Sequence, residues 1–203
     1  MIRNFVFDMG QVLMDFNIPY FMKQKNVSPE DEQLLYRNIF HSLEWIGLDR
    51  GRYNEAQAVE IMCSRLPARL HDTVYRLVCE WDLPEILPVE GMADLIRELK
   101  EKGYGIFLLS NASVRQHEYW PRIPGFQYFD DTLISADVHL VKPEREIFLA
   151  AYDKFHIRPE ESIFIDDVTI NVECATCTGI NGYVFQEDTE EFRRWLTGQG
   201  LLP

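Results

Sequence analysis

The chain has 203 residues, enough for one compact α/β domain that carries a small inserted subdomain. Hydrophobic residues make up 46% and charged residues 26% of the chain, which are ordinary globular values and argue against disorder. The net charge of −13 argues against nucleic acid as a partner, because proteins hold phosphate backbones with clustered Lys and Arg side chains.

The N-terminal segment, MIRNFVFDMGQ, has only a short apolar stretch and does not resemble a signal peptide. No run approaches the roughly 20 apolar residues that span a bilayer, so we expect no membrane segment. Cys174 and Cys177 form a CxxC pair, which allows a zinc or redox site, but no second CxxC or His pair completes one. We therefore expect reduced thiols and a cytoplasmic protein.

Residues 2–7, IRNFVF, form a short apolar run that ends at Asp8. Its β-branched and aromatic composition predicts a buried strand with Asp8 at the carboxyl tip. Residues 16–86 differ, because their apolar residues recur at helical spacing and predict several helices. Ser28 before Pro29 is typical of a helix start, with Ser as the N-cap.

From residue 87 onward, strand and helix patterns alternate. The sequence predicts helices over 89–102, 143–155, 168–178 and 190–198, and strands within 104–110, 130–138, 162–167 and 182–185. This alternation predicts an α/β fold with a Rossmann-like, doubly wound parallel sheet and helices on both faces. The core then comprises residues 1–15 and 87–203, and residues 16–86 form an inserted α-helical cap.

Acidic residues follow two of the predicted strands. Asp8 could attack phosphorus as a nucleophile, although an Asp at such a place can also cap the next turn. Asp166 and Asp167 are adjacent acids whose charge needs a cation to offset it. Mg²⁺ suits them, because it prefers one or two carboxylates together with water and substrate oxygens. A surface acid pair is the alternative interpretation.

Two further patterns suit a phosphate group. Ser110 and Asn111 follow a predicted strand, where a hydroxyl, an amide and backbone N–H groups can meet phosphate oxygens, although a helix cap is the alternative. Lys142, in LVKPE before a predicted helix, can neutralise a phosphate and a negative nucleophile, or it is a solvated surface Lys. Ligands of parallel sheets bind at the carboxyl ends of the strands, where these residues fall.

Four segments, taken in order, resemble the motifs of one family. FVFDMGQVL, LLSNA, VKPE and FIDDVTIN resemble the first to fourth motifs of the haloacid dehalogenase-like hydrolases. The resemblance covers nearly the whole chain and extends to stretches such as YWPRIP. It is closest to a group with a small helical cap, which includes bacterial glucose-1-phosphate phosphatases and the N-terminal phosphatase domain of soluble epoxide hydrolase.

This resemblance implies a magnesium-dependent phosphatase that hydrolyses a small phosphate monoester, such as a sugar phosphate, through an aspartyl-phosphate intermediate. Asp8 is then both the nucleophile and a metal ligand. Asp167 binds Mg²⁺ directly, and Asp166 binds it directly or indirectly. The Gly10 carbonyl oxygen could be a further ligand, and Asn171 supports the metal through a water.

The resemblance also assigns the substrate contacts. Ser110 and Asn111 bind the phosphoryl group, and Lys142 holds both the phosphate and the Asp8 carboxylate. The cap either sets the substrate or merely packs its own core with the aromatic and Arg side chains that it contains. These residues are His41, Trp45, Arg50, Arg52 and Tyr53. The sequence allows either a monomer or a homodimer.

The chain departs from the family pattern at Gly10, where most of these phosphatases carry an Asp that protonates the leaving oxygen and later activates water. Losing such help costs about 10²–10⁴-fold in rate. A good leaving group, such as the anomeric oxygen of a sugar 1-phosphate, would reduce that need. Alternatively, a bound water or a cap residue supplies the proton; His41, which could instead be packed inside the cap, and Glu44 are candidates.

Two other functions stay open. In the first, turnover is lost and the protein only binds a phosphorylated ligand or a partner. In the second, the chain is a 2-haloacid dehalogenase that uses Asp8 without a metal. That interpretation leaves Asp166 and Asp167 unexplained, and no halide-binding Arg stands near the first motif.

Overall fold

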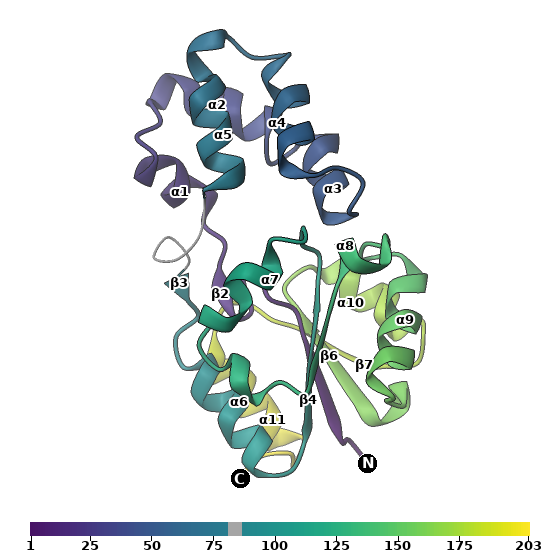
Figure 1. Ribbon diagram of the computed structural model, residues 1–203. Coiled ribbons are helices and arrows are strands. Elements are labelled where there is room, and N and C mark those ends of the chain that lie inside the picture. Colours follow the sequence, from purple (N-terminus) through teal and green to yellow (C-terminus); the bar gives the residue numbers. More distant parts are fainter. Residues whose placement is uncertain (81–86) are drawn as a thin grey trace.

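A computed structural model describes residues 1–80 and 87–203 (Figure 1). A five-stranded, all-parallel sheet has the order β5-β4-β1-β6-β7. Its strands are β5 (Asp131–Ile134), β4 (Gly105–Ser110), β1 (Asn4–Phe7), β6 (Ser162–Asp166) and β7 (Asn181–Val184). Because the first strand lies in the middle of the sheet, the chain winds outward in both directions. The predicted Rossmann-like, doubly wound α/β fold is confirmed.

Helices cover both faces of the sheet (Figure 1). They are α6 (Met92–Glu101) and α11 (Thr189–Gly198) on one face, and α9 (Arg145–Phe155) and α10 (Thr169–Thr176) on the other. Alternate side chains of β1 serve the two cores, because Phe5 and Phe7 pack with one set of helices and Val6 with the other. Fully burying each such side chain stabilises the fold by about 1.5–3 kcal/mol.

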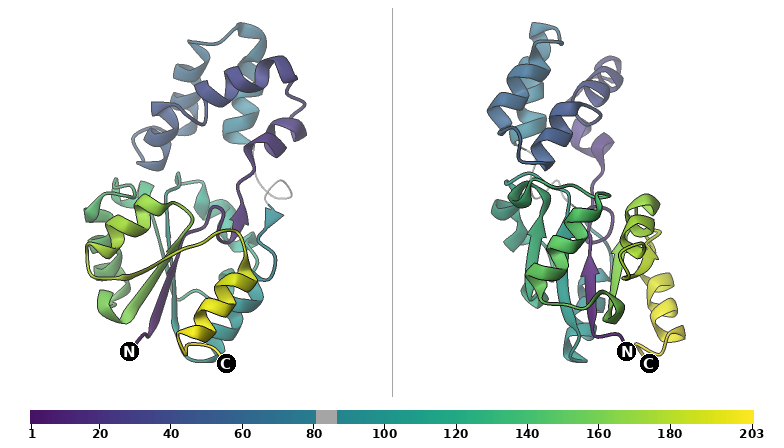
Figure 2. Two further views of the ribbon diagram at one scale, coloured as in Figure 1. Left: turned by 180° about the vertical axis from the view of Figure 1, so that it is seen from behind. Right: turned by 90° about the vertical axis from the view of Figure 1, so that its right-hand side faces the viewer.

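The register of the central strands brings the predicted site residues together. Phe7 at the end of β1 lies beside Leu108 of β4 and Ile165 of β6. The residues that follow these strands therefore meet at one edge of the sheet. Figure 2 shows both chain termini at the opposite end of the molecule from the cap.

The segment after β1 forms a separate helical layer above this edge (Figure 1). Its helices are α1 (Ile18–Gln24), α2 (Pro29–Asn38), α3 (Leu43–Asp49), α4 (Glu55–Cys63) and α5 (His71–Cys79), with a 3₁₀ turn at Ala68–Leu70. They bury an apolar core of their own, in which Leu35, Ile39 and Met62 are fully inaccessible. The predicted cap boundary at residue 86 lies outside the described residues.

Some local details differ from the sequence-based expectations. The strand predicted within 130–138 is present as β5, but the short helix α8 (Ser135–Val138) that follows it was not predicted. Ser28 does precede α2, but its hydroxyl donates to Asp31 at 2.9 Å rather than accepting a backbone N–H. An antiparallel pair of two-residue strands, β2 (Met14–Asp15) and β3 (Leu87–Pro88), escaped prediction.

The remaining elements are the helix α7 (Gln116–Tyr119) and short 3₁₀ turns at Trp120–Arg122, Phe126–Tyr128 and Pro159–Glu161. Cys174 and Cys177, the CxxC pair, are free thiols at the end of α10 and just beyond it. Among the described residues, no helix has both the length and the apolar character that crossing a membrane requires.

Candidate active site

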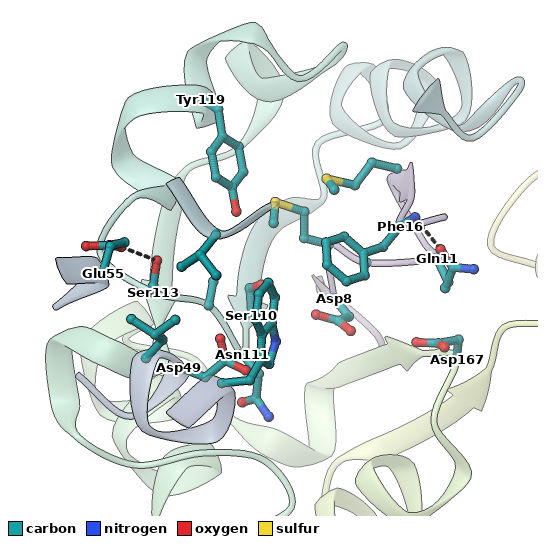
Figure 3. A pocket seen from close by; sticks show the side chains of 17 residues that line it. Asp8, Gln11, Phe16, Asp49, Glu55, Ser110, Asn111, Ser113, Tyr119 and Asp167 are labelled. Atoms are coloured by element: carbon teal, nitrogen blue, oxygen red, sulfur yellow. Dashed lines mark hydrogen bonds between the residues drawn. The ribbon is translucent and has the colours of Figure 1, made fainter. Parts of the chain in front are cut away.

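A pocket of about 300 Å³ lies between the carboxyl edge of the sheet and the cap (Figure 3). The core contributes the strand ends and the loops that follow them, and the cap contributes residues of α3, α4 and α5. The polar side chains that line the pocket are Asp8, Gln11, Asp49, Glu55, Ser110, Asn111, Ser113, Tyr119 and Asp167. Its apolar lining includes Met14, Phe16, Trp45, Leu48 and Val78.

Asp8 sits at the tip of β1, as the sequence predicts. Its backbone N–H donates to the Ile165 carbonyl oxygen at 2.8 Å, which continues the pairing of β1 with β6. The side chain is almost wholly buried but reaches the pocket. Burial, reinforced by Asp166 and opposed by Lys142, raises the pKa of Asp8 to about 7. A cation beside this carboxylate therefore favours the ionised form that a nucleophile needs.

Lys142 is the cation that the structure places there. Its ammonium lies 2.8 Å from Asp8 Oδ1 and 2.7 Å from Asp166 Oδ2, and it donates to the Leu109 carbonyl oxygen at 3.1 Å. Its side chain is 1% exposed. Burial alone would lower the pKa of Lys142, but the two carboxylates hold it above its ordinary value. All three donor positions of this ammonium are thus used, and the charge is fixed between two acids.

Asp166 is completely buried and held from several sides. The Asn171 amide donates to both of its oxygens, at 3.0 and 3.1 Å, and the Val168 N–H donates at 2.8 Å. With Lys142 as a further donor, this carboxylate has a fixed orientation. Asn171, predicted to act through a water, here contacts Asp166 directly.

The site also has the donors that a hard cation requires. Carboxylate oxygens of Asp8, Asp166 and Asp167 lie within 4.8 Å of one another, and this is the metal-type cluster that the described residues form. Burial and the neighbouring Asp166 raise the pKa of Asp167 to about 6. Oxygen donors of this kind fit Mg²⁺, which takes one or two carboxylates and keeps open positions for water and phosphate. Gly10, whose carbonyl was the other predicted ligand, lines the same pocket.

The sequence model of the haloacid dehalogenase-like hydrolases matches residues 2–175 of the chain. The chain belongs to this family. The family resemblance predicted from the four motifs is therefore confirmed, and the chain is a hydrolase. The narrower likeness to glucose-1-phosphate phosphatases and to the epoxide hydrolase domain stays a prediction.

Individual proteins are similar over most of the chain. A phosphorylated carbohydrates phosphatase of Thermotoga maritima is 26% identical over 181 residues, which cover 86% of this chain and 81% of that protein. A sesquiterpene phosphatase of Aspergillus oryzae is 27% identical over 87% of this chain and 86% of that protein. A solved structure of a family enzyme from Bacteroides thetaiotaomicron is also similar, with a TM-score of 0.68 and 25% sequence identity. That enzyme is in complex with magnesium and inorganic phosphate, and the match covers 95% of this chain and 99% of that chain.

Asn111 has a second function in this hydrolase besides lining the pocket. Its side-chain oxygen accepts from the Lys142 backbone N–H at 2.8 Å, and its amide donates to the Lys142 carbonyl oxygen at 3.0 Å. The Asn111 side chain therefore anchors the segment that carries the buried ammonium. Ser110, 1% exposed, also lines the pocket, and the predicted phosphate contacts of both residues stay a prediction.

The cap residues named as acid–base candidates lie elsewhere. His41 is exposed and its ring lies beside that of Tyr36, tilted by 36° with ring centroids 4.5 Å apart, so it is neither in the pocket nor packed in the cap core. Glu44 is buried against Arg65, whose guanidinium donates to it at 3.0 and 2.6 Å and lowers its pKa. Neither lines the pocket, so the structure does not support either as the proton donor.

Of the other cap residues named as possible substrate contacts, one lines the pocket and three do not. Trp45 lines the pocket. Arg50 instead forms a bidentate ion pair with Glu144 of the core. Arg52 lies over the ring of Tyr53, 5.4 Å from its centroid, and neither residue lines the pocket. Of the cap side chains that were singled out in the sequence, Trp45 alone faces the site.

The cap carboxylate Asp49 was not among the residues predicted from the sequence. It is the last residue of α3, is half-buried and lines the pocket. Trp45 and Asp49 are four residues apart, so a helix places them on one face. That spacing was the available signal, because Trp45 was already a candidate for the substrate side of the cap.

Proposed function

We propose that this hydrolase is a magnesium-dependent phosphatase that cleaves a small phosphate monoester with Asp8 as the nucleophile. The observation that carries the proposal is the buried Lys142 ammonium, which joins Asp8 to Asp166 beside Asp167 at the base of the capped pocket. A nucleophilic carboxylate, a fixed cation and a set of oxygen donors for a metal are what phosphoryl transfer to Asp requires.

In the proposed reaction, an Asp8 oxygen attacks phosphorus in line with the leaving oxygen and forms an aspartyl-phosphate. Lys142 keeps the Asp8 carboxylate in place and offsets charge on the transferring phosphoryl group. Asp166 and Asn111 hold Lys142 in that position. When bound, Mg²⁺ would supply further charge neutralisation at the phosphoryl oxygens. Water then hydrolyses the aspartyl-phosphate and regenerates Asp8.

Comparisons with relatives support this reaction class. The Thermotoga maritima and Aspergillus oryzae relatives are both named phosphatases and match this chain over more than four fifths of its length. The Bacteroides thetaiotaomicron enzyme, which shares the fold and 25% of the sequence, binds magnesium and inorganic phosphate together. This chain provides a carboxylate cluster at the sheet edge that suits the same pair of ligands.

The pocket lining favours an uncharged, hydroxylated leaving group. One wall is apolar and includes the aromatic faces of Phe16 and Trp45, and the cap adds the carboxylates Asp49 and Glu55. Among the described residues that line it, none is Lys or Arg, so a second anionic group would lack a partner. Arg50, expected to serve such a group, is paired with Glu144. A sugar phosphate fits this lining, because its hydroxyls can donate to carboxylates while its carbon faces pack on aromatic rings.

The test is phosphate release from a panel of sugar phosphates, with and without magnesium. The panel includes sugar 1-phosphates, primary alkyl phosphates and an aryl phosphate. The native protein should release phosphate only with magnesium, and Asp8→Asn should lower the rate by at least about 10⁴-fold, because the nucleophile is gone. Asp153→Asn, an exposed acid on α9, is the matched control and should keep native activity.

Other outcomes would change the assignment. Binding of phosphate or of a sugar phosphate without turnover of any ester, including the aryl phosphate, would indicate the binding protein that Gly10 suggests. Metal-independent release of halide from a 2-haloacid would indicate a dehalogenase. Full phosphatase activity in Asp8→Asn would show that Asp8 is not the nucleophile.

A further inference from the structure

Gly10 leaves the core side of the pocket without the acid–base side chain that the family pattern places two residues after Asp8, and in the proposed reaction the leaving group points away from the core. In-line attack places the leaving oxygen opposite Asp8 across the phosphorus atom. Asp8 attacks from the sheet edge, so the leaving oxygen faces the cap. An alkoxide needs a proton as it departs, which makes an acid on the cap side valuable. Among the described residues, the cap carboxylates that line the pocket are Asp49 and Glu55.

Glu55 is already engaged. It begins α4, and its Oε1 accepts a hydrogen bond from the Ser113 hydroxyl of the core at 3.1 Å. Asp49 differs, because no donor within residues 1–80 and 87–203 hydrogen-bonds its carboxylate. Figure 3 shows Asp49 reaching the pocket from the cap, whereas Asp8 reaches it from the core. Asp49 is therefore the cap acid whose carboxyl group is available to a bound substrate.

Contacts between cap and core fix the backbone at Asp49. The Ser135 hydroxyl of α8 donates to the Asp49 carbonyl oxygen. His139 Nδ1 lies 3.0 Å from the carbonyl oxygen of Arg50, and the Arg50 guanidinium pairs with Glu144. The end of α3 is thus bonded to the core at Asp49 and at the residue that follows it.

The cap and the core also approach each other closely at Gly51, the residue after Arg50. Gly51 has a φ of +64°, and a Cβ atom there would lie 2.5 Å from the Ala136 carbonyl oxygen. Both the backbone conformation and the space require glycine at this position. This tight docking sets the depth at which Asp49 enters the pocket.

The surroundings of Asp49 suit a group that both gives and takes a proton. Burial and the negative charge of Asp8 raise its pKa to about 7, against the opposing effect of Lys142. Tyr119 of α7 lines the same pocket, and burial together with the charge of Asp49 raises the pKa of that phenol. A carboxyl group whose pKa is raised by burial keeps its proton at a higher pH than an exposed Asp does, as a general acid must.

We propose that Asp49 is the general acid and base of this enzyme, in the place that Gly10 leaves empty; the proposal rests on the phosphatase function above. As Asp8 forms its bond to phosphorus, the ester P–O bond breaks and the Asp49 proton passes to the leaving oxygen, which gives the alcohol. The Asp49 carboxylate then takes a proton from water, whose oxygen attacks the aspartyl-phosphate. The P–O bond to Asp8 breaks, phosphate leaves, and Asp49 is again protonated.

The test compares Asp49→Asn on two leaving groups with magnesium present. On a primary alkyl phosphate, kcat/KM should fall by about 10²–10⁴-fold, because the alkoxide departs without a proton. On 4-nitrophenyl phosphate, kcat/KM should fall by less than about 10-fold, since nitrophenolate needs no protonation. The first turnover should then release one equivalent of nitrophenolate in a burst, followed by slow steady turnover, because hydrolysis of the aspartyl-phosphate still lacks its base. Asp72→Asn, an exposed acid on the cap helix α5, is the matched control.

A rescue experiment separates chemistry from misfolding. A Cβ atom at Gly10 would meet nothing within 4 Å, and Gly10 does not have a positive φ, so Gly10→Asp can be accommodated. Adding Gly10→Asp to Asp49→Asn should restore at least about 10-fold of the lost alkyl phosphatase activity, because it supplies another acid beside Asp8.

The outcomes distinguish the role of Asp49 from the phosphatase function itself. An active native protein whose Asp49→Asn variant is unimpaired, or equally impaired on both esters with no rescue, would overturn the role of Asp49 and leave the phosphatase function standing. A native protein that hydrolyses neither ester would overturn both.

Discussion

The buried acids of the pocket and those of the cap are held in opposite ways. In the cap, Glu44 and Asp31 each accept two hydrogen bonds from an Arg of their own, Arg65 and Arg69. These guanidinium groups lower the pKa of both carboxyl groups. In each pair the guanidinium charge balances the carboxylate charge. These acids therefore stay ionised, and the ion pairs join parts of the cap.

In the pocket, acids outnumber cations. Among the described residues, Asp8, Asp49, Glu55 and Asp167 line the pocket and Asp166 is buried beside them, whereas the cation that lies among these acids is Lys142, which pairs with Asp8 and Asp166. Burial raises the pKa of Asp8 and Asp49 to about 7 and that of Asp167 to about 6. The excess negative charge must be met by a metal ion or by protons, which are the two species that the proposed reaction needs. The same residue type is thus ion-paired and structural in one region, and left with excess negative charge in the other.

The largest effect is expected when the shared cation is removed. Lys142→Met keeps most of the side-chain volume but leaves Asp8 and Asp166 buried without an opposite charge. The free energy of unfolding should fall by about 3–5 kcal/mol. Phosphate release should be lost as well. Urea unfolding followed by circular dichroism, without magnesium, measures the stability of the variant against the native protein.

An exposed pair on the same core provides the control. Lys154 of α9 lies 2.6 Å from Asp131, and both side chains are about two-fifths exposed. Lys154→Met should cost at most about 1 kcal/mol, because water screens this pair. Equal losses from the two Lys substitutions would contradict the view that burial makes the pocket charge distinctive.

A smaller effect on activity is expected when Asp166 loses the hydrogen bonds that fix its orientation. Asn171→Ala removes the amide that donates to both Asp166 oxygens. Because Asp166 orients Lys142 and belongs to the proposed metal cluster, kcat/KM should fall by about 10–100-fold and half-saturation should require more magnesium. Asn181→Ala removes an amide bonded to the Ser162 carbonyl oxygen, at the start of β6, and should leave both quantities unchanged. An unchanged magnesium requirement in Asn171→Ala would separate Asn171 from the metal site.

The strand-tip part of the site was predictable because of how parallel sheets are built. The apolar runs that became β1, β4 and β6 were clear in the sequence, and the polar residues after each run had to meet at one edge. The strand ends made Asp8, Asp166 and Asp167 candidates, and the family resemblance gave them their predicted roles. The two-residue strands β2 and β3 were not found, because so short a segment carries no periodicity.

The cap side of the pocket was not predictable in the same way. Which face of α3 meets the core depends on the docking of Arg50 and Gly51 against α8 and Glu144, contacts between segments about 90 residues apart. Residue type alone suggested His41 and Glu44, and packing directed one to the surface and the other to Arg65. Only the helical spacing from Trp45 pointed to Asp49.

The smallest effect is expected in the cap, from Glu44→Gln. The Arg65 guanidinium holds the pKa of Glu44 below its ordinary value of 4.5, so the pair stabilises the fold fully above that pH. This stabilisation is lost as the pH falls through the lower, folded-state pKa. Because Arg65 is partly exposed, the substitution should lower the free energy of unfolding by only about 1 kcal/mol at neutral pH.

Urea unfolding of both proteins at neutral pH and again well below pH 4.5 measures this contribution, and the gap between them should close in acid. Phosphatase activity should stay at the native level, since Glu44 does not line the pocket. A loss of about 10²-fold in kcat/KM with unchanged stability would make Glu44 an acid of the reaction. The distinction between cap acids that each have a guanidinium of their own and pocket acids that outnumber their cation would then fail, because Glu44 would have to donate a proton although Arg65 keeps it ionised.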